Sequence, residues 1–234
     1  MSHTVTAKKT KMVEHVDIFK RLLPLARKGP SMSLSEVGEF MALTSELFRE
    51  VLVAAGFDER QILRLTTKFR DACRRSAPWK PTSSKVPGRP QDGADGNRIN
   101  RWLLPKEHKF YADEKTATLT EIKYYYQALS MENAPSLGNK EFCKSLVWLL
   151  GHNIEPGAYR DPLQLVPIDL KAVIDDASRI QSGHLVPLDR GGKHEPKNTF
   201  LMLKGSNALQ GNYTVDELLN IMEQIVNRHK ARKK

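Results

Sequence analysis

The sequence predicts an α+β fold that is mostly helical, and two observations lead to this prediction. Apolar residues recur at helical spacing through most of the 234-residue chain, so that they form one face of each segment. Only residues 180–188 and 199–203 have the β-prone composition of short strands, and a helical pattern follows them. We therefore expect helices along most of the chain and a strand–loop–strand–helix unit near the C-terminus.

The N-terminal part is expected to contain a basic arm followed by helices. Residues 1–16 have the composition of a flexible arm, and residues 17–78 show helical periodicity. Ser33 and Glu36 form a capping-box pattern before a long helix that Gly56 ends, and Asp58 starts a second helix. The outer face of the second helix is basic, which indicates a solvated surface or, as an alternative, a phosphate-contacting face.

A segment rich in Pro, Gly, Ser and Asp, residues 80–97, separates two regions. We therefore predict a helical region at residues 1–79, for DNA recognition or assembly, a linker at 80–99, and a second region at 100–234. In the second region, Thr118 and Glu121 are expected to cap one helix and Asn139 to precede another that Gly151 ends. Tyr124, Tyr125 and Tyr126 on the first of these are expected to pack in the core, and stacking on bases is the alternative.

Charge and cysteine content restrict the classes of partner and cofactor. The formal net charge of +10 favours a polyanionic partner, because Lys and Arg neutralise phosphates. No apolar run is long enough for a membrane span, and no signal-peptide pattern is present, so a cytoplasmic location is expected. Cys73 and Cys143 lie far apart and outside any CxxC pair, so that neither structural zinc nor a disulfide framework is expected.

Residues 180–212 contain the groups that could carry chemistry. The order strand, loop, strand, helix places the end of the first strand beside the start of the helix. His184 and Asn207 are therefore expected to face one small cleft. Ser206 is a plausible N-cap of the helical turn that begins there, and Thr214 with Glu217 is expected to cap the long helix that follows.

This segment resembles the HNH (ββα-metal) endonucleases. His184 with Pro187 is similar to the H-x-x-P start of the motif, the Gly191-Gly192 loop and Asn198 to its second landmark, and Asn207 to its third. The resemblance covers about thirty residues and implies a nuclease region at 100–234, with the ββα-metal motif at 178–232.

The resemblance also implies a role for each residue. His184 would be the general base, since an imidazole with an ordinary pKa of about 6.5 is mostly neutral at pH 7–8. Asn198 would support the loop, and Asn207 would supply an oxygen ligand to one divalent cation, Mg²⁺ with Mn²⁺ as the alternative. The cations around the motif would contact phosphates: Arg179, Arg190, Lys193, Lys197 and Lys204.

One position departs from the pattern of many HNH enzymes, which carry a metal-binding Asp directly before the histidine. Here the residue is Gly183. Either the metal is held by Asn207 and waters, which we favour, or Asp175, Asp176 or Asp189 replaces the missing acid. His194 lies in the loop between the strands and is expected to be a surface histidine, distant from the site because the hairpin would carry it away.

The function implied is divalent-metal-dependent hydrolysis of phosphodiester bonds in double-stranded DNA, sequence-specific and of the restriction type. The alternatives are a DNA-binding ββα protein without catalysis and a nonspecific DNase or RNase toxin. A homodimer is one possible assembly.

Overall fold

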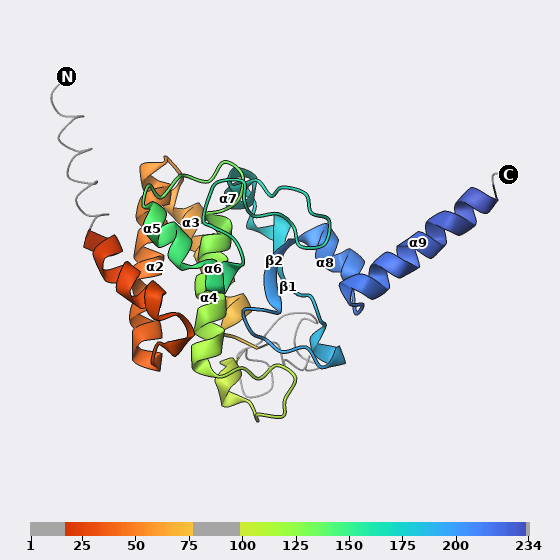
Figure 1. Ribbon diagram of the computed structural model, residues 1–234, viewed down its shortest axis with the longest axis horizontal. Helices are drawn as coiled ribbons and strands as arrows, with labels where there is room; N and C mark the ends of the chain where they lie inside the picture. Colours follow the sequence, from red (N-terminus) through yellow and green to blue (C-terminus); the bar gives the residue numbers. More distant parts are fainter. Residues whose placement is uncertain (1–16, 77–98, 233–234) are drawn as a thin grey trace, which may run out of the picture.

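The computed structural model describes residues 17–76 and 99–232, and the predicted basic arm at 1–16 lies outside this range. Residues 17–28 are helical, and the later helices and strands follow in the order shown in Figure 1. The longer helices are α2 (Leu34–Ala54), α3 (Glu59–Cys73), α4 (Glu114–Ala128) and α9 (Val215–Ala231). The shorter elements are η1 (Gly29–Ser31), η2 (Arg101–Leu103), α5 (Lys140–Ser145), α6 (Val147–Leu150), α7 (Leu170–Asp175), η3 (Ala177–Arg179), β1 (Ile180–His184), η4 (Leu188–Arg190), β2 (Thr199–Leu203) and α8 (Lys204–Gln210). The predicted α+β fold, mostly helical with a two-stranded antiparallel sheet near the C-terminus, is confirmed.

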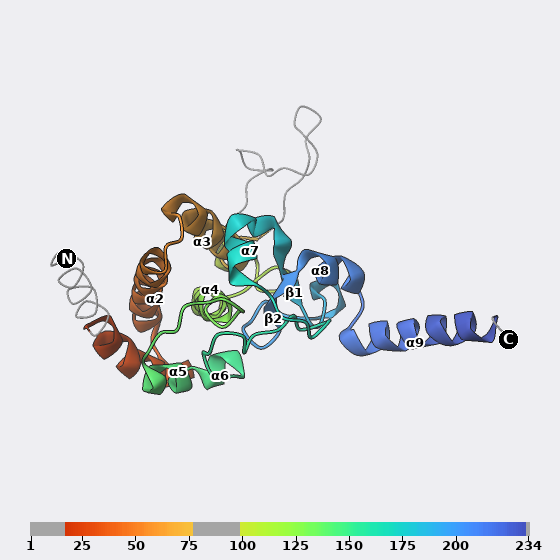
Figure 2. The ribbon, with the colours of Figure 1, turned by 90° about the horizontal axis from the view of Figure 1, so that it is seen from above.

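Helix α4 lies at the centre of the fold. It is surrounded by α2, α3, α6 and β2, and every residue from Ala117 to Ala128 is buried (Figure 2). A helix buried on all sides needs no polar face, which explains its weak sequence periodicity. The rings of Tyr124, Tyr125 and Tyr126 are at most 2% exposed, so they pack in the core as expected and are not available for base stacking.

Several predicted helix ends are confirmed, and one was placed too late in the sequence. The capping boxes at Ser33 and Thr214 are both formed, and the Asp58 side chain caps α3. Helix α4 begins at Glu114 and not near Thr118, because the carboxylate of Asp113 accepts a hydrogen bond from the Thr116 amide at 2.9 Å. The cap therefore forms one turn earlier than the Thr118–Glu121 pattern suggested.

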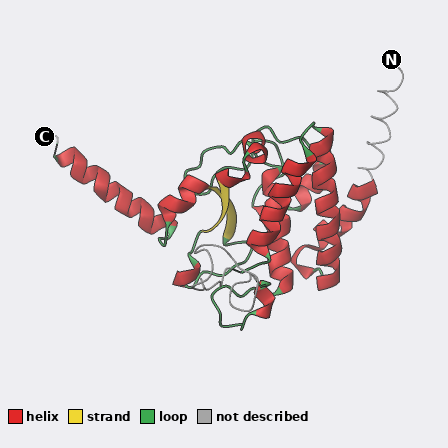
Figure 3. Cartoon of the chain, turned by 180° about the vertical axis from the view of Figure 1, so that it is seen from behind, coloured by secondary structure: helices red, strands yellow, loops and turns green. Residues whose placement is uncertain are grey.

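The small sheet is a hairpin of β1 and β2, seen as the only yellow arrows of the described chain in Figure 3. Ile180 pairs with Leu203 and His184 with Thr199. The first strand ends at His184 and not at residue 188, because the backbone of Val186 turns away to bond with the Asn198 side chain. Helix α8 starts at Lys204, directly after β2; Ser206 does not cap it but is buried and accepts a hydrogen bond from Gln164.

Side chains of the helical body satisfy the outer edge of β2. Lys123 donates to the carbonyl of Thr199 at 3.0 Å, and the Gln127 amide oxygen accepts from the Leu201 amide at 3.2 Å. Tyr159 donates to the Leu201 carbonyl at 2.6 Å. Because unpaired backbone groups on an edge strand are costly when buried, these contacts fix the hairpin against α4.

The buried apolar residues of the described chain pack into one hydrophobic core. Its members lie between residues 18 and 201 and come from both sides of the predicted linker. Residues 80–98 of that linker lie outside the described ranges, and the division into a helical region and a nuclease region stays a prediction. Within the described ranges no helix has the length and apolar character that crossing a membrane requires.

Candidate active site

A cleft of about 650 Å³ lies where the C-terminal end of α3 meets the hairpin, η4 and the end of α8. His184 and Asn207 both line it, as the strand–helix order predicted. The cleft wall also contains charged and polar side chains from other elements, namely Asp71, Arg75, Arg101, Asp189 and Gln210. The site is therefore built from three separate parts of the chain: the end of α3, residues 101–110 and residues 182–212.

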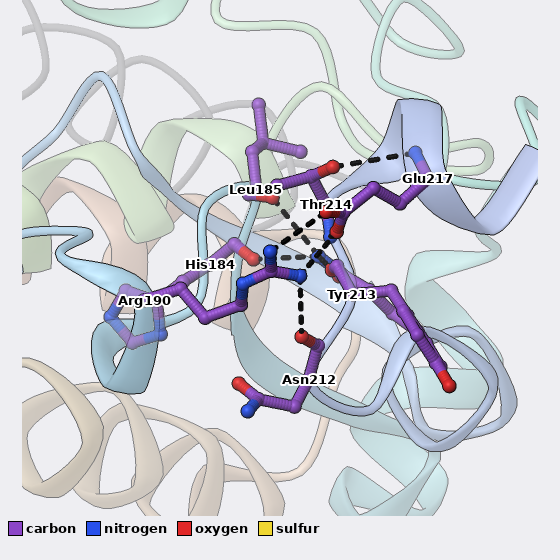
Figure 4. Close-up of polar contacts among 8 residues, drawn as sticks. His184, Leu185, Arg190, Asn212, Tyr213, Thr214 and Glu217 are labelled. Atoms are coloured by element: carbon purple, nitrogen blue, oxygen red, sulfur yellow. Dashed lines mark hydrogen bonds and ion pairs between the residues drawn. The ribbon is translucent and has the colours of Figure 1, made fainter.

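His184 is held at the end of β1 by its backbone. The buried side-chain amide of Gln210 donates to the carbonyl of His184 at 2.9 Å and to that of Leu185 at 3.1 Å. Figure 4 shows the His184 and Leu185 backbone at this point. Because Gln210 is the last residue of α8, the end of the strand and the end of the helix are fixed to each other.

The structure corrects the prediction for His194. This residue is only 1% exposed, and its Nδ1 lies 3.2 Å from Nε2 of His184, in a hydrogen bond between the two rings. The prediction assumed that the hairpin extends beyond His184. Instead, η4 and the left-handed Gly191 turn the chain, and the loop folds back under β1.

Asn198 closes this loop. Its Oδ1 accepts from the Val186 amide at 2.8 Å, and its Nδ2 donates to the carbonyls of Val186 and Lys193, both at 2.9 Å. A Cβ atom on Gly192 would lie 2.0 Å from the Val186 carbonyl oxygen, so only glycine allows this close approach. These contacts agree with the supporting position expected for Asn198; its catalytic contribution stays a prediction.

Asn207 is oriented by a neighbour on β1. Its Nδ2 donates to the Oε1 of Gln181 at 2.8 Å. Among the described residues no donor binds its Oδ1, which lies on the Gly183 side of the side chain. Asn207 therefore presents one amide oxygen at the cleft.

The position before His184 cannot carry a side chain in this packing. A Cβ atom on Gly183 would lie 2.0 Å from Sδ and 2.9 Å from Cγ of Met202, and 3.2 Å from Oδ1 of Asn207. Met202 is fully buried. Its side chain fills the space that the Asp of many HNH enzymes would need, which gives a physical reason for the glycine.

Burial controls the protonation of both histidines. It lowers the pKa of His184 to about 4, and the positive charge of Arg101 acts in the same direction. Burial also holds the pKa of His194 well below its ordinary value, with smaller contributions from Arg101 and His184. The pKa of His184 is therefore lower than the ordinary value expected from the sequence, and both rings are neutral near pH 7.

Two carboxylates line the cleft. Asp71 extends from α3, with its Oδ1 buried and 3.7 Å from Nε of both Arg70 and Arg75. Asp189 lies on η4 and pairs with Lys109. Asp175 and Asp176 are outside the cleft, at the end of α7, so Asp189 is the one sequence-proposed replacement acid that the structure places there.

The oxygen atoms available at the cleft suit a hard cation such as Mg²⁺ that is held by few protein ligands. The described residues contain no group of three or more His, Cys, Asp or Glu side chains arranged to hold a metal ion. Mg²⁺ takes oxygen ligands and usually keeps several waters, so the Asn207 amide oxygen and water or phosphate oxygens form a workable set.

The predicted phosphate-contacting residues surround the motif but do not line the cleft. Arg179 and Lys204 flank the far end of the hairpin, beside the Ile180–Leu203 pair. Lys193 and Lys197 are exposed in the loop, and Lys197 pairs with Glu195 at 3.3 Å.

Arg190 forms an ion pair with the first turn of α9. Its guanidinium forms an ion pair with Glu217, with one contact at 2.7 Å, and reaches the Asn212 carbonyl at 3.5 Å (Figure 4). Glu217 also completes the capping box with Thr214. The charge of Arg190 is thus largely neutralised within the chain.

Two cations of the cleft wall come from outside the motif. Arg101 donates to the carbonyls of Ala72, Cys73 and Phe110, at 3.0–3.1 Å, and so covers the C-terminal carbonyls of α3. Arg75 is exposed at the same helix end. The basic face of α3 was visible in the sequence, but no pattern indicated that its end would face His184.

Comparison with known proteins gives little further information. No family model matches the chain, and no curated protein matches it either. A crystal structure of a type II restriction endonuclease aligns with 57% of this chain and 62% of that chain, at 19% sequence identity and a TM-score of 0.44. The shared part is less than two thirds of that protein. A similarity at this TM-score does not establish a shared fold or a shared function.

Proposed function

We propose that this chain is a divalent-metal-dependent endonuclease of the HNH type that hydrolyses phosphodiester bonds in double-stranded DNA. The observation that carries the proposal is the cleft that contains both His184 and Asn207, each held by a buried or partly buried partner. A neutral imidazole and a free amide oxygen beside basic side chains form a site suited to a phosphodiester.

His184 would accept a proton from the attacking water. Its neutral ring is available near pH 7, and the bond to His194 fixes the ring plane. The water oxygen then bonds to phosphorus, and the bond from phosphorus to the 3′ oxygen breaks. The leaving 3′ oxygen takes up a proton from solvent and His184 releases the proton that it accepted, so that the products are a 5′-phosphate and a 3′-hydroxyl.

Asn207 would hold the cation, Mg²⁺ or Mn²⁺, which when bound neutralises charge on the scissile phosphate and stabilises the leaving oxygen. Gln181 keeps the Asn207 amide oriented so that its oxygen remains available. Gln210 and Asn198 hold the strand end and the loop, and both act on backbone groups next to His184.

Arg75 and Arg101 place positive charge in the cleft wall, where a phosphate would be bound. The exposed side chains of Arg179, Lys193, Lys197 and Lys204 would contact flanking phosphates. Because these contacts read no bases, the sequence specificity that we propose, of the restriction type, would come from the helical region or another flank.

The test is digestion of phage-sized DNA by the purified chain with Mg²⁺ or Mn²⁺, followed by sequencing of the fragments. Discrete ends at one sequence support a restriction-type enzyme, and random ends indicate a nonspecific nuclease. DNA that is bound but stays uncut with either metal would overturn the catalytic assignment and leave the DNA-binding alternative.

A further inference from the structure

Helix α9 is amphipathic, but no element among the described residues covers its apolar side. The helix runs away from the body in Figures 1 and 2, and Leu218 is its one buried residue. Four large apolar side chains along the same side remain 41–52% exposed: Leu219, Met222, Ile225 and Val226.

Such a helix needs a partner to be stable along its length. The capping box of Thr214 and Glu217 and the ion pair with Arg190 stabilise the first turn. Beyond Leu218 no residue of this 17-residue helix is buried against the described part of the chain. Helices of about this length are marginal in water unless an amphipathic face packs against something.

The distribution of charge along α9 indicates what packs there. The first turn is acidic, with Asp216 and Glu217, and the last turn is basic, with Arg228, His229 and Lys230. We propose that α9 pairs with α9 of a second copy of this chain, in antiparallel orientation. This orientation sets each acidic end beside a basic end, whereas a parallel pair would bring two basic ends together.

The apolar spacing provides a register for this pair. Leu219, Met222 and Val226 are exposed and follow the alternating three- and four-residue steps of a coiled-coil seam, and the exposed Ile225 lies on the same side of the helix. In the antiparallel register that sets Glu217 of one copy level with Lys230 of the other, Met222 of one copy lies level with Ile225 of the other. Polar residues such as Gln224 then face away from the pair.

The pairing would also bring the basic helix end of each copy near the candidate site of the other. Helix α9 starts directly after residues 211–212, which line the cleft. The basic last turn of one copy therefore lies near the rim of the other copy's cleft, where it can contact phosphates. The pairing itself does not depend on the proposed activity, so failure of one leaves the other standing.

Sedimentation of the full-length protein over a range of concentrations tests the pairing. We expect a concentration-dependent dimer, because a few side chains per copy form a small interface. Ile225→Lys should weaken dimerisation at least about tenfold by placing a charge in the seam. Gln224→Lys adds the same charge on the opposite side and should dimerise as the unmodified chain does. A monomer at all concentrations, or equal dimerisation of the two folded variants, would overturn the proposal.

Crosslinking tests the orientation, since both native cysteines are buried. In the proposed register two copies of Met222→Cys lie about 4–5 Å apart along the axis, and two copies of His229→Cys about 16 Å apart. A short bismaleimide should therefore link the Met222→Cys protein and not the His229→Cys protein. Efficient linking of both would indicate a parallel pair and contradict the antiparallel arrangement.

Discussion

Replacing Gly183 with alanine tests whether Met202 excludes a side chain at the position where many HNH enzymes carry Asp. The new Cβ would lie 2.0 Å from the Met202 sulfur, whereas non-bonded heavy atoms at van der Waals contact are about 3.5–4.0 Å apart. Met202 is fully buried, so its side chain cannot swing into solvent. The clash must be relieved by an unfavourable rotamer or by a shift of the hairpin.

The expected loss of folding stability is that of other protein cores into which an extra methyl group is forced. Gly183→Ala should lower the free energy of unfolding by about 1–3 kcal/mol. Met202→Ala alone should lower it by about 2–5 kcal/mol, because it leaves a cavity. In the double variant the methyl group enters that cavity, so the combined loss should be smaller than the sum by roughly 1–3 kcal/mol.

Urea denaturation followed by circular dichroism measures these free energies for the four proteins of the cycle. Gly205→Ala is the matched control, because nothing lies within 4 Å of its added Cβ and it is an exposed helical residue of α8. That control should gain up to about 1 kcal/mol from reduced backbone entropy. Additive losses in the double variant, or a Gly183→Ala protein as stable as the unmodified chain, would refute the explanation of the glycine.

Three further predictions concern the two site residues His194 and Asn207 and the buried Lys123, which holds β2. His194→Ala should slow cleavage at least about tenfold while DNA affinity stays unchanged, because His184 loses its ring partner; an unchanged rate would show that the ring contact is not needed. Asn207→Ala should raise the Mg²⁺ or Mn²⁺ concentration needed for cleavage, or abolish cleavage, and a metal titration of the nicking rate measures this; an unaltered titration would remove Asn207 as the ligand. Burial lowers the pKa of Lys123 to about 7, so between pH 7 and 9 the unfolded chain binds a proton that the folded chain does not. Stability should therefore rise with pH in this window, less so in Lys123→Met; equal slopes in urea denaturation would contradict that pKa.

The sequence predicted those structural features that depend on interactions between residues close together in the chain. The capping boxes at Ser33 and Thr214, the buried tyrosines of α4 and the two strands follow from patterns within a few residues. The shared cleft of His184 and Asn207 also followed, because a strand, a short loop and a helix constrain each other over about thirty residues.

The positions of Asp71, Arg101 and His194 at the site depend on contacts between distant parts of the chain, and the sequence did not predict them. Asp71 and Arg101 reach the cleft because α3 packs against α4, which in turn holds β2 through Lys123 and Gln127. His194 looked like an ordinary loop residue, since its burial depends on how Asn198 folds the loop back. No spacing rule encodes such contacts.

The central claim, that His184 is the general base of a metal-dependent nuclease, is tested most directly by the single-turnover cleavage rate of His184→Ala. The rate on a DNA substrate cut by the unmodified chain, at saturating Mg²⁺, should fall by about 10²–10⁴ while the DNA dissociation constant stays within a factor of about two. His152→Ala, a histidine outside the cleft, is the control and should cleave normally. A His184→Ala protein that cleaves at nearly the original rate would contradict the account.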